Sequence, residues 1–280
     1  MLADLNSLQI DSGRPQIVPF STKGEGPPLL FVHDVTGTVD VYYRVVELLN
    51  PDRPCFGIHA PAYTAAADAG LTIEAMASSY LKASRSLLTA DGNAVLAGFS
   101  LGGMIAYEMA RQHAESGGRE LPVLMVDITV SLPRSRLELT RDMMLNLPAW
   151  LRHDGLKTSP WALVQRGLRR VHKAFAPNAP LPSSGIWAEL LGRPVAHPET
   201  TQVMLAALRK YVPPPYSGPV VLLRGKDRHL FNTRDPALGW SAYAQNLRTD
   251  ALPGSHDTWI LDAKLPASVE VMRRNLDSFG

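Results

Sequence analysis

Short apolar runs alternate with helical patterns along most of this chain. The apolar runs are, in order, LLFVH, CFGIHA, AVLAGFS, LPVLMVD and PVVLLRGKD. Between them, apolar residues recur three and four positions apart, as in VYYRVVELL, TIEAMASSYLKASRSLL and MIAYEMARQH. This alternation predicts an α/β fold with a mostly parallel central sheet flanked by crossover helices. Toward the C-terminus we expect a helix around 236–245, a short strand near Ala251 and a last helix from Pro266 to about Phe279.

Two stretches depart from the alternation. Residues 1–27 are polar and rich in Gly and Pro, which is typical of a linker or N-terminal extension, with one edge strand at about Gln16–Phe20. We therefore place the folded domain at 28–280. No strand-like run lies between about Ile128 and Gly218, whereas several helical patterns do, so we expect a helical lid inserted at about 132–217.

The predicted lid contains an amphipathic helix and a group of tryptophans. The helix has one apolar stripe, formed by Trp161, Val164, Leu168, Val171 and Phe175. The tryptophans of this stretch are Trp150, Trp161 and Trp187. They form either a small core of the lid itself or part of the lining of a substrate channel.

Composition and charge narrow the class of protein. The chain has 280 residues, of which 45% are apolar and 19% charged, and this is enough to bury one large core. Its formal net charge of +2 gives no reason to expect nucleic-acid or membrane binding. Cys55 is the single cysteine, so we expect no intrachain disulfide and a reducing, cytoplasmic compartment. Asp4 and Asp11 lie where a signal peptide would be basic and then apolar, so we expect no export by that route.

The most specific local motif is a serine between two glycines where a strand is predicted to turn into a helix. The sequence GFSLG at 98–102 follows an apolar run and precedes a helical pattern. This is a G-x-S-x-G nucleophile elbow in its expected structural context. The turn holds the Ser100 hydroxyl clear of the sheet, and a side chain at Gly98 or Gly102 would collide with neighbouring backbone. Ser100 is therefore the candidate nucleophile.

A serine nucleophile needs an acid and a base. In α/β proteins with this nucleophile elbow, they follow the serine along the chain in the order Ser, Asp or Glu, His. His256 lies in the loop before the last predicted helix, from which its imidazole can reach Ser100, and His229 is the alternative base. Asp127 and Asp227 each end a predicted strand, and either carboxylate can reach the far nitrogen of the same histidine. Spacing therefore leaves the acid open.

Oxyanion stabilisation requires two backbone N–H groups aimed at the developing charge. We expect one at Leu101, at the start of the predicted helix, where the helix dipole adds to the effect. Val35 is the candidate for the other, in the loop HDVTG, which Gly37 allows to turn sharply. Cys55 offers the one alternative thiol nucleophile, but it begins a predicted strand and is expected to be a small buried hydrophobe.

With these motifs the chain resembles the type I thioesterase domains of nonribosomal peptide synthetases and polyketide synthases, which belong to the α/β-hydrolase superfamily. The resemblance covers nearly the whole chain and rests on HDVTG with Tyr42 or Tyr43 downstream, AGFSLGG followed by AYEMA, LMVDITVSLP, VVLLRGKD and GSH. It implies Ser100 as nucleophile, Asp127 as acid and His256 as base. The stand-alone type II thioesterases are similar but place their acid after the next strand, where this chain has Asp227.

The oxyanion loop departs from the family pattern His-Pro-x-Gly-Gly. Asp34 replaces the proline, and Thr36 precedes a single glycine, Gly37. An acidic side chain beside an oxyanion hole opposes the developing negative charge unless it points away or is paired.

The resemblance implies that Ser100 accepts an acyl or peptidyl chain from the phosphopantetheine thioester of a carrier domain and releases it by macrocyclisation or hydrolysis. No permanently bound cofactor and no metal are implied. A basic patch formed by Arg166, Arg169, Arg170 and Lys173 is either a docking surface for an acidic carrier domain or a solvated helix face. The alternatives are a stand-alone type II editing thioesterase or small-ester hydrolase, and an inactive hydrolase-fold binding protein.

Overall fold

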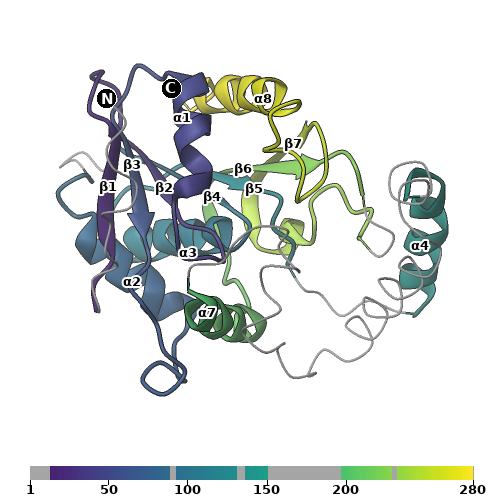
Figure 1. Cartoon of the computed structure of the whole chain (residues 1–280), viewed down its shortest axis with the longest axis horizontal. Helices are drawn as coiled ribbons and strands as arrows, with labels where there is room; N and C mark the ends of the chain where they lie inside the picture. Colours follow the sequence, from purple (N-terminus) through teal and green to yellow (C-terminus); the bar gives the residue numbers. More distant parts are fainter. Residues whose placement is uncertain (1–12, 89–92, 131–135, 151–196, 229–231, 280) are drawn as a thin grey trace.

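The computed structural model of the chain describes residues 13–88, 93–130, 136–150, 197–228 and 232–279. Its centre is a seven-stranded sheet in the order β1-β3-β2-β4-β5-β6-β7 (Figure 1). The strands are β1 (Gln16–Ser21), β2 (Leu29–Val32), β3 (Cys55–His59), β4 (Val95–Phe99), β5 (Val123–Val126), β6 (Tyr216–Gly225) and β7 (Ala244–Leu252). β1 pairs antiparallel with β3, and the other described pairs are parallel. The predicted α/β class with a mostly parallel sheet is therefore confirmed.

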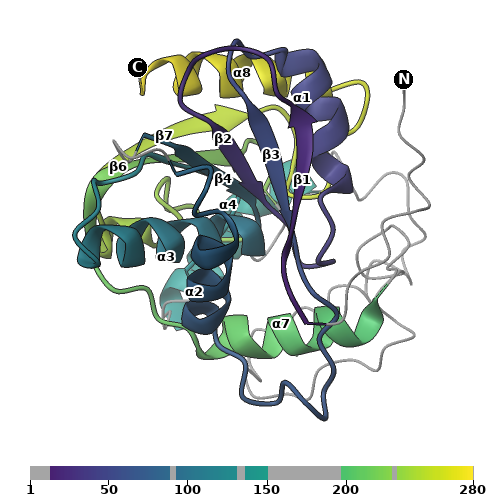
Figure 2. The same cartoon turned by 90° about the vertical axis from the view of Figure 1, so that its left-hand side faces the viewer.

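Helices cover both faces of the sheet. α1 (Tyr43–Leu49) and α8 (Leu265–Asp277) lie together on one face, whereas α2 (Ile73–Ala83) and α3 (Leu101–Glu115) lie on the other (Figure 2). Two short 3₁₀ helices, Asp40–Tyr42 and Trp240–Ala242, lie in connecting segments. The predicted edge strand at the N-terminus is confirmed as β1, and the predicted last helix is confirmed as α8.

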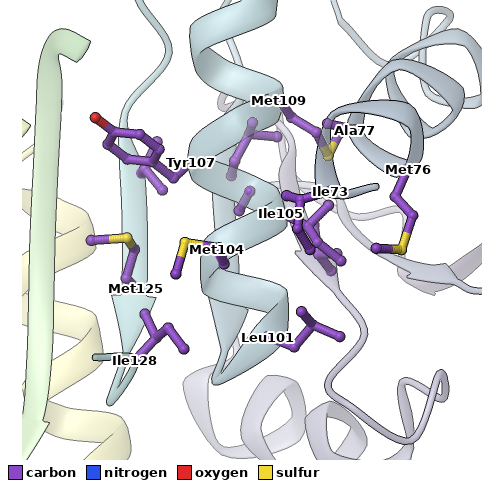
Figure 3. Close-up of a cluster of buried hydrophobic side chains, with 14 of the residues drawn as sticks. Ile73, Met76, Ala77, Leu101, Met104, Ile105, Tyr107, Met109, Met125 and Ile128 are labelled. Atoms are coloured by element: carbon purple, nitrogen blue, oxygen red, sulfur yellow. The ribbon is translucent and has the colours of Figure 1, made fainter. Parts of the chain in front are cut away.

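Side chains of successive strand residues pack on opposite faces of the sheet, which gives the molecule two cores. In β4, Leu96 belongs to the core under α2 and α3, whereas Val95, Ala97 and Phe99 belong to the core under α1 and α8. Figure 3 shows the first core around α3, where Leu101, Met104 and Ile105 are buried between α2 and β5. The central strand β4 and the helix that follows it are thus held from both sides.

In the described part of the segment predicted as a lid lie the helices α4 (Arg136–Trp150) and α7 (Pro198–Lys210). α7 contacts the segment after β3. The Thr200 hydroxyl accepts a hydrogen bond from the Tyr63 N–H and donates one to the Tyr63 C=O. The amphipathic stripe from Trp161 to Phe175 and Trp187 lie outside the described residues. Within the described ranges, no helix has the length and apolar character needed to span a membrane.

The prediction of a helix around 236–245 is wrong. The Asp235 carboxylate accepts hydrogen bonds from the N–H groups of Ala237 and Gly239, and Leu238 and Gly239 both have positive φ, which is incompatible with a continuing helix. The strand expected near Ala251 begins earlier, because β7 runs over Ala244–Leu252. β7 forms one edge of the sheet and many of its residues are exposed, so its sequence AQNLRTDAL carries little of the apolar pattern that marks a buried strand.

Candidate active site

Ser100 lies on the tight turn between β4 and α3. Its backbone has φ 53° and ψ −123°, a strained conformation for a residue with a side chain. The turn is fixed by the Ser100 N–H, which donates to the Val126 carbonyl at 2.8 Å. Residues 94–99 and 101–110 are all buried, whereas Ser100 is partly exposed. The fold therefore presents this one serine to solvent from the middle of a buried segment.

The flanking glycines have the steric role that the sequence predicts. A Cβ at Gly98 would lie 2.2 Å from the Gly102 carbonyl carbon, and a Cβ at Gly102 would lie 2.4 Å from the Val32 carbonyl oxygen. The first turn of α3 thus packs directly on the end of β4 and on the end of β2. Only glycine allows this approach without a backbone shift.

Asp127 and His256 are in direct contact. The Asp127 Oδ2 atom lies 3.0 Å from His256 Nδ1, and the side chain of Asp127 is only 5% exposed. Burial alone would raise the pKa of Asp127, but the hydrogen bonds and opposite charges around it outweigh burial, so its pKa is lowered. Burial alone would lower the pKa of His256, but the hydrogen bond and charge of Asp127 outweigh it, so this pKa is raised. The pair is therefore an ionised acid oriented toward a histidine of increased basicity.

Two further groups hold the Asp127 carboxylate. Its Oδ1 atom accepts a hydrogen bond from the Gly225 N–H at 2.8 Å and lies 3.3 Å from Nη1 of Arg228. The side chain of Arg228 is only 10% exposed, and burial lowers the pKa of this guanidinium. Arg228 is part of no motif in the sequence that indicated a site residue. Its position three residues after the end of β6, directly following Asp227, was the one signal available.

The other candidate acid is not at this contact. Asp227 forms an ion pair with Lys264 Nζ at 2.9 Å, at the start of α8. His229 lies outside the described residues. Of the two aspartates that spacing left open, Asp127 is thus the one that contacts His256.

His256 also lies beside the serine turn. Its ring packs on the ring of Phe99, with centroids 4.7 Å apart, and Phe99 directly precedes Ser100. Trp259 packs on the edge of the same phenylalanine. The structure therefore gathers the serine turn, the histidine and the aspartate at the carboxyl end of the sheet, where α/β proteins place their sites.

The loop after β2 lies against the first turn of α3, through the close approach of Gly102 to Val32. The Asp34 carboxylate is buried and accepts hydrogen bonds from the Thr36 N–H at 2.8 Å and the Thr36 hydroxyl at 2.6 Å. Its charge is therefore satisfied within its own loop. The backbone N–H groups of Val35 and Leu101 donate to no described residue.

Tyr42 connects this loop to the serine turn. Its hydroxyl donates to the Val32 carbonyl and accepts from the Phe99 N–H, each at 2.8 Å. The family resemblance allowed either Tyr42 or Tyr43 downstream of HDVTG. Tyr42 bridges the ends of β2 and β4, whereas Tyr43 packs on Phe20.

Cys55 is a free, buried thiol at the start of β3, as expected. Burial raises its pKa to about 12, so it is protonated at neutral pH and is a poor nucleophile. The basic patch from Arg166 to Lys173 lies outside the described residues and stays a prediction.

Comparison with known proteins assigns the family. The model of the thioesterase domain family matches residues 27–275. The polyketide synthase PksR of Bacillus subtilis (strain 168) is 34% identical over 123 residues, which are 43% of this chain and 5% of PksR. The probable thioesterase lcsE of Purpureocillium lilacinum is 28% identical over 236 residues, which are 73% of this chain and 70% of lcsE.

A solved structure shows the same fold. The NocB thioesterase domain in covalent complex with a fluorophosphonate nocardicin G analog has a TM-score of 0.59 and 23% identity, over 94% of this chain and 99% of the NocB chain. The α/β-hydrolase fold expected from the resemblance is therefore confirmed. The family match spans almost the whole folded part, from before β2 to within α8. The chain belongs to the thioesterase domain family.

Proposed function

We propose that this chain is a serine thioesterase that ends the synthesis of a nonribosomal peptide or polyketide. Its substrate is an acyl or peptidyl chain carried as a thioester on the phosphopantetheine arm of a carrier domain. The observation that carries the proposal is the Asp127–His256 contact at 3.0 Å, next to a strained and partly exposed Ser100. A buried acid, a histidine and an exposed serine on a strand-to-helix turn are the parts that acyl transfer needs.

The first half of the reaction forms an acyl-enzyme. The Ser100 hydroxyl oxygen attacks the thioester carbonyl carbon while His256 takes the hydroxyl proton. Negative charge then develops on the carbonyl oxygen, and the N–H groups of Leu101 and Val35 stabilise it. The tetrahedral intermediate collapses as the carbon–sulfur bond breaks, and His256 returns its proton to the departing sulfur. Asp127 keeps its charge throughout and stabilises the imidazolium.

The second half releases the chain. Water, or a hydroxyl or amine of the chain itself, attacks the ester carbonyl as His256 removes its proton. The bond to Ser100 breaks and His256 returns the proton to the serine oxygen. Water gives a free acid, and the internal nucleophile gives a ring. A lid that excludes water favours the ring.

Labelling and product analysis test the proposal. A fluorophosphonate probe should label the wild-type protein on Ser100, and Ser100→Ala should lose both the label and turnover of a synthetic acyl thioester. Ser116→Ala is the matched control, since Ser116 follows the last residue of the same helix. Labelling that persists in Ser100→Ala refutes the nucleophile, and an unlabelled, inactive wild-type protein supports the binding-protein alternative.

Mass spectrometry of the products then separates ring from acid. Turnover restricted to short acyl thioesters, with no release of long chains, favours the stand-alone editing enzyme. That enzyme would use the acid at Asp227, which here is paired with Lys264.

A further inference from the structure

A buried chain of hydrogen bonds lies beneath the loop that follows β2. His33 is fully buried directly after this strand. Its Nδ1 atom lies 2.6 Å from the carbonyl oxygen of Asp34, and its Nε2 atom lies 2.6 Å from the hydroxyl of Tyr80 on α2. The rings of His33 and Tyr80 also pack edge to face, with centroids 5.4 Å apart. The proposed triad uses none of these groups.

The chemistry of these partners assigns the protons. Burial lowers the pKa of His33 to about 4, so the imidazole is neutral at pH 7 and carries one N–H. A carbonyl oxygen can only accept, so this proton is on Nδ1 and is donated to Asp34. Nε2 therefore accepts from the Tyr80 hydroxyl. The Asp34 carbonyl and the Tyr80 hydroxyl together select the Nδ1–H tautomer.

Two donors hold one peptide unit of this loop. The Asp34 C=O accepts from His33 Nδ1 at 2.6 Å and from the Gly37 N–H at 3.0 Å. The C=O of Asp34 and the N–H of Val35 belong to the same planar trans peptide, so the Val35 N–H is turned away from the imidazole. That N–H donates to no described residue. A peptide flip would break both bonds and leave the buried Nδ1–H of His33 facing another donor, which is costly.

We propose that His33 is a positioning residue that keeps the Val35 N–H aimed at the oxyanion, with Tyr80 selecting its tautomer. The inference rests on the proposed function, because it takes Val35 to be an oxyanion donor.

Three variants test the role of the donor. His33→Leu removes it, His33→Asn keeps an N–H donor near the position of Nδ1, and Tyr80→Phe removes the group that selects the tautomer. Loss of a whole oxyanion donor lowers kcat about 10²- to 10³-fold. We expect His33→Leu to lower kcat by at least about tenfold with KM nearly unchanged, because the donor is needed mainly in the transition state. His33→Asn should recover most of this loss, and Tyr80→Phe should fall in between.

The matched control is His59→Leu. His59 is buried at the end of the neighbouring strand β3, and its Nδ1 atom lies 3.0 Å from the carbonyl of the next residue, Ala60. Thermal unfolding and the end-point of fluorophosphonate labelling give the folded, active fraction of each variant. After this correction, His59→Leu should keep the wild-type kcat.

The outcomes separate this inference from the proposed function. An inactive wild-type protein refutes the proposed function. An active wild-type protein with unchanged kcat in His33→Leu overturns only the role of His33. A loss in His33→Leu that His33→Asn does not recover, at equal unfolding temperature, also overturns it, because the N–H donor would then not be what matters.

Discussion

Replacing Asp127 by asparagine tests the centre of the site. The variant has almost the same shape but no charge. Its amide oxygen should keep the two donors that now face Oδ1, the Gly225 N–H and Arg228. The amide N–H₂ group then faces His256 Nδ1, whose other neighbour is the Asp127 carbonyl oxygen, also 3.0 Å away. When Nδ1 accepts from the amide, the ring proton is on Nε2, the nitrogen that should take the proton of Ser100, and in that tautomer the base is blocked.

The contact distance gives the size of the effect. Two unit charges 3.0 Å apart interact by about 5.5 kcal/mol at an effective dielectric constant of about 20. At about 1.4 kcal/mol for each tenfold change in rate, this corresponds to nearly four orders of magnitude in kcat. His256 is 33% exposed, and solvent screening reduces the effect. We therefore expect kcat to fall about 10³- to 10⁴-fold, the range found when a triad acid is replaced by its amide.

The assay is turnover of a synthetic acyl thioester as a function of pH. The base must be neutral, so activity falls as pH drops through the pKa of His256. In the wild-type protein Asp127 raises this pKa, and the acidic limb of kcat/KM should lie above pH 6.5. In Asp127→Asn the remaining activity should have its limb at lower pH. Asp227→Asn is the control and should keep wild-type kcat. A large loss in Asp227→Asn with a small one in Asp127→Asn would refute the reasoning.

Two further predictions concern the supports of the site. Gly98→Ala places a Cβ 2.2 Å from backbone, so we expect a loss of about 1–3 kcal/mol or more in the free energy of unfolding, measured by denaturant titration. Gly70→Ala meets nothing within 4 Å and should change little; equal stability of the two variants would contradict the close packing. Arg228→Met removes a cation 3.3 Å from Asp127, so the pKa of His256 should rise and the acidic limb should move to higher pH. An unmoved limb would show that this charge does not reach the histidine.

The sequence alone determined the features that depend on neighbouring residues. Strand and helix periods follow from which face of each element is buried, and they predicted the sheet and its flanking helices. Gly98 is required by the sterics of the serine turn itself, which the motif contains in full, whereas Gly102 is required by the close approach of the Val32 carbonyl. Prediction failed at 236–245 and in β7. In the first case the positive φ of Leu238 and Gly239 prevents a continuous helix, and in the second an exposed edge strand had little reason to alternate.

Tertiary structure decided which distant groups meet. Asp127 and Asp227 end neighbouring parallel strands, which lie only about 5 Å apart, so a histidine on a loop can reach either carboxylate. The path of the loop after β7 and the ion pair with Lys264 determine that Asp127 contacts His256. The hydrogen bond from Tyr80 to His33 joins residues 47 positions apart, and Arg228 reaches Asp127 across 101. No local sequence pattern predicts such contacts. They depend on how the helices and strands pack together, and not on the hydrophobic periodicity within any one of them.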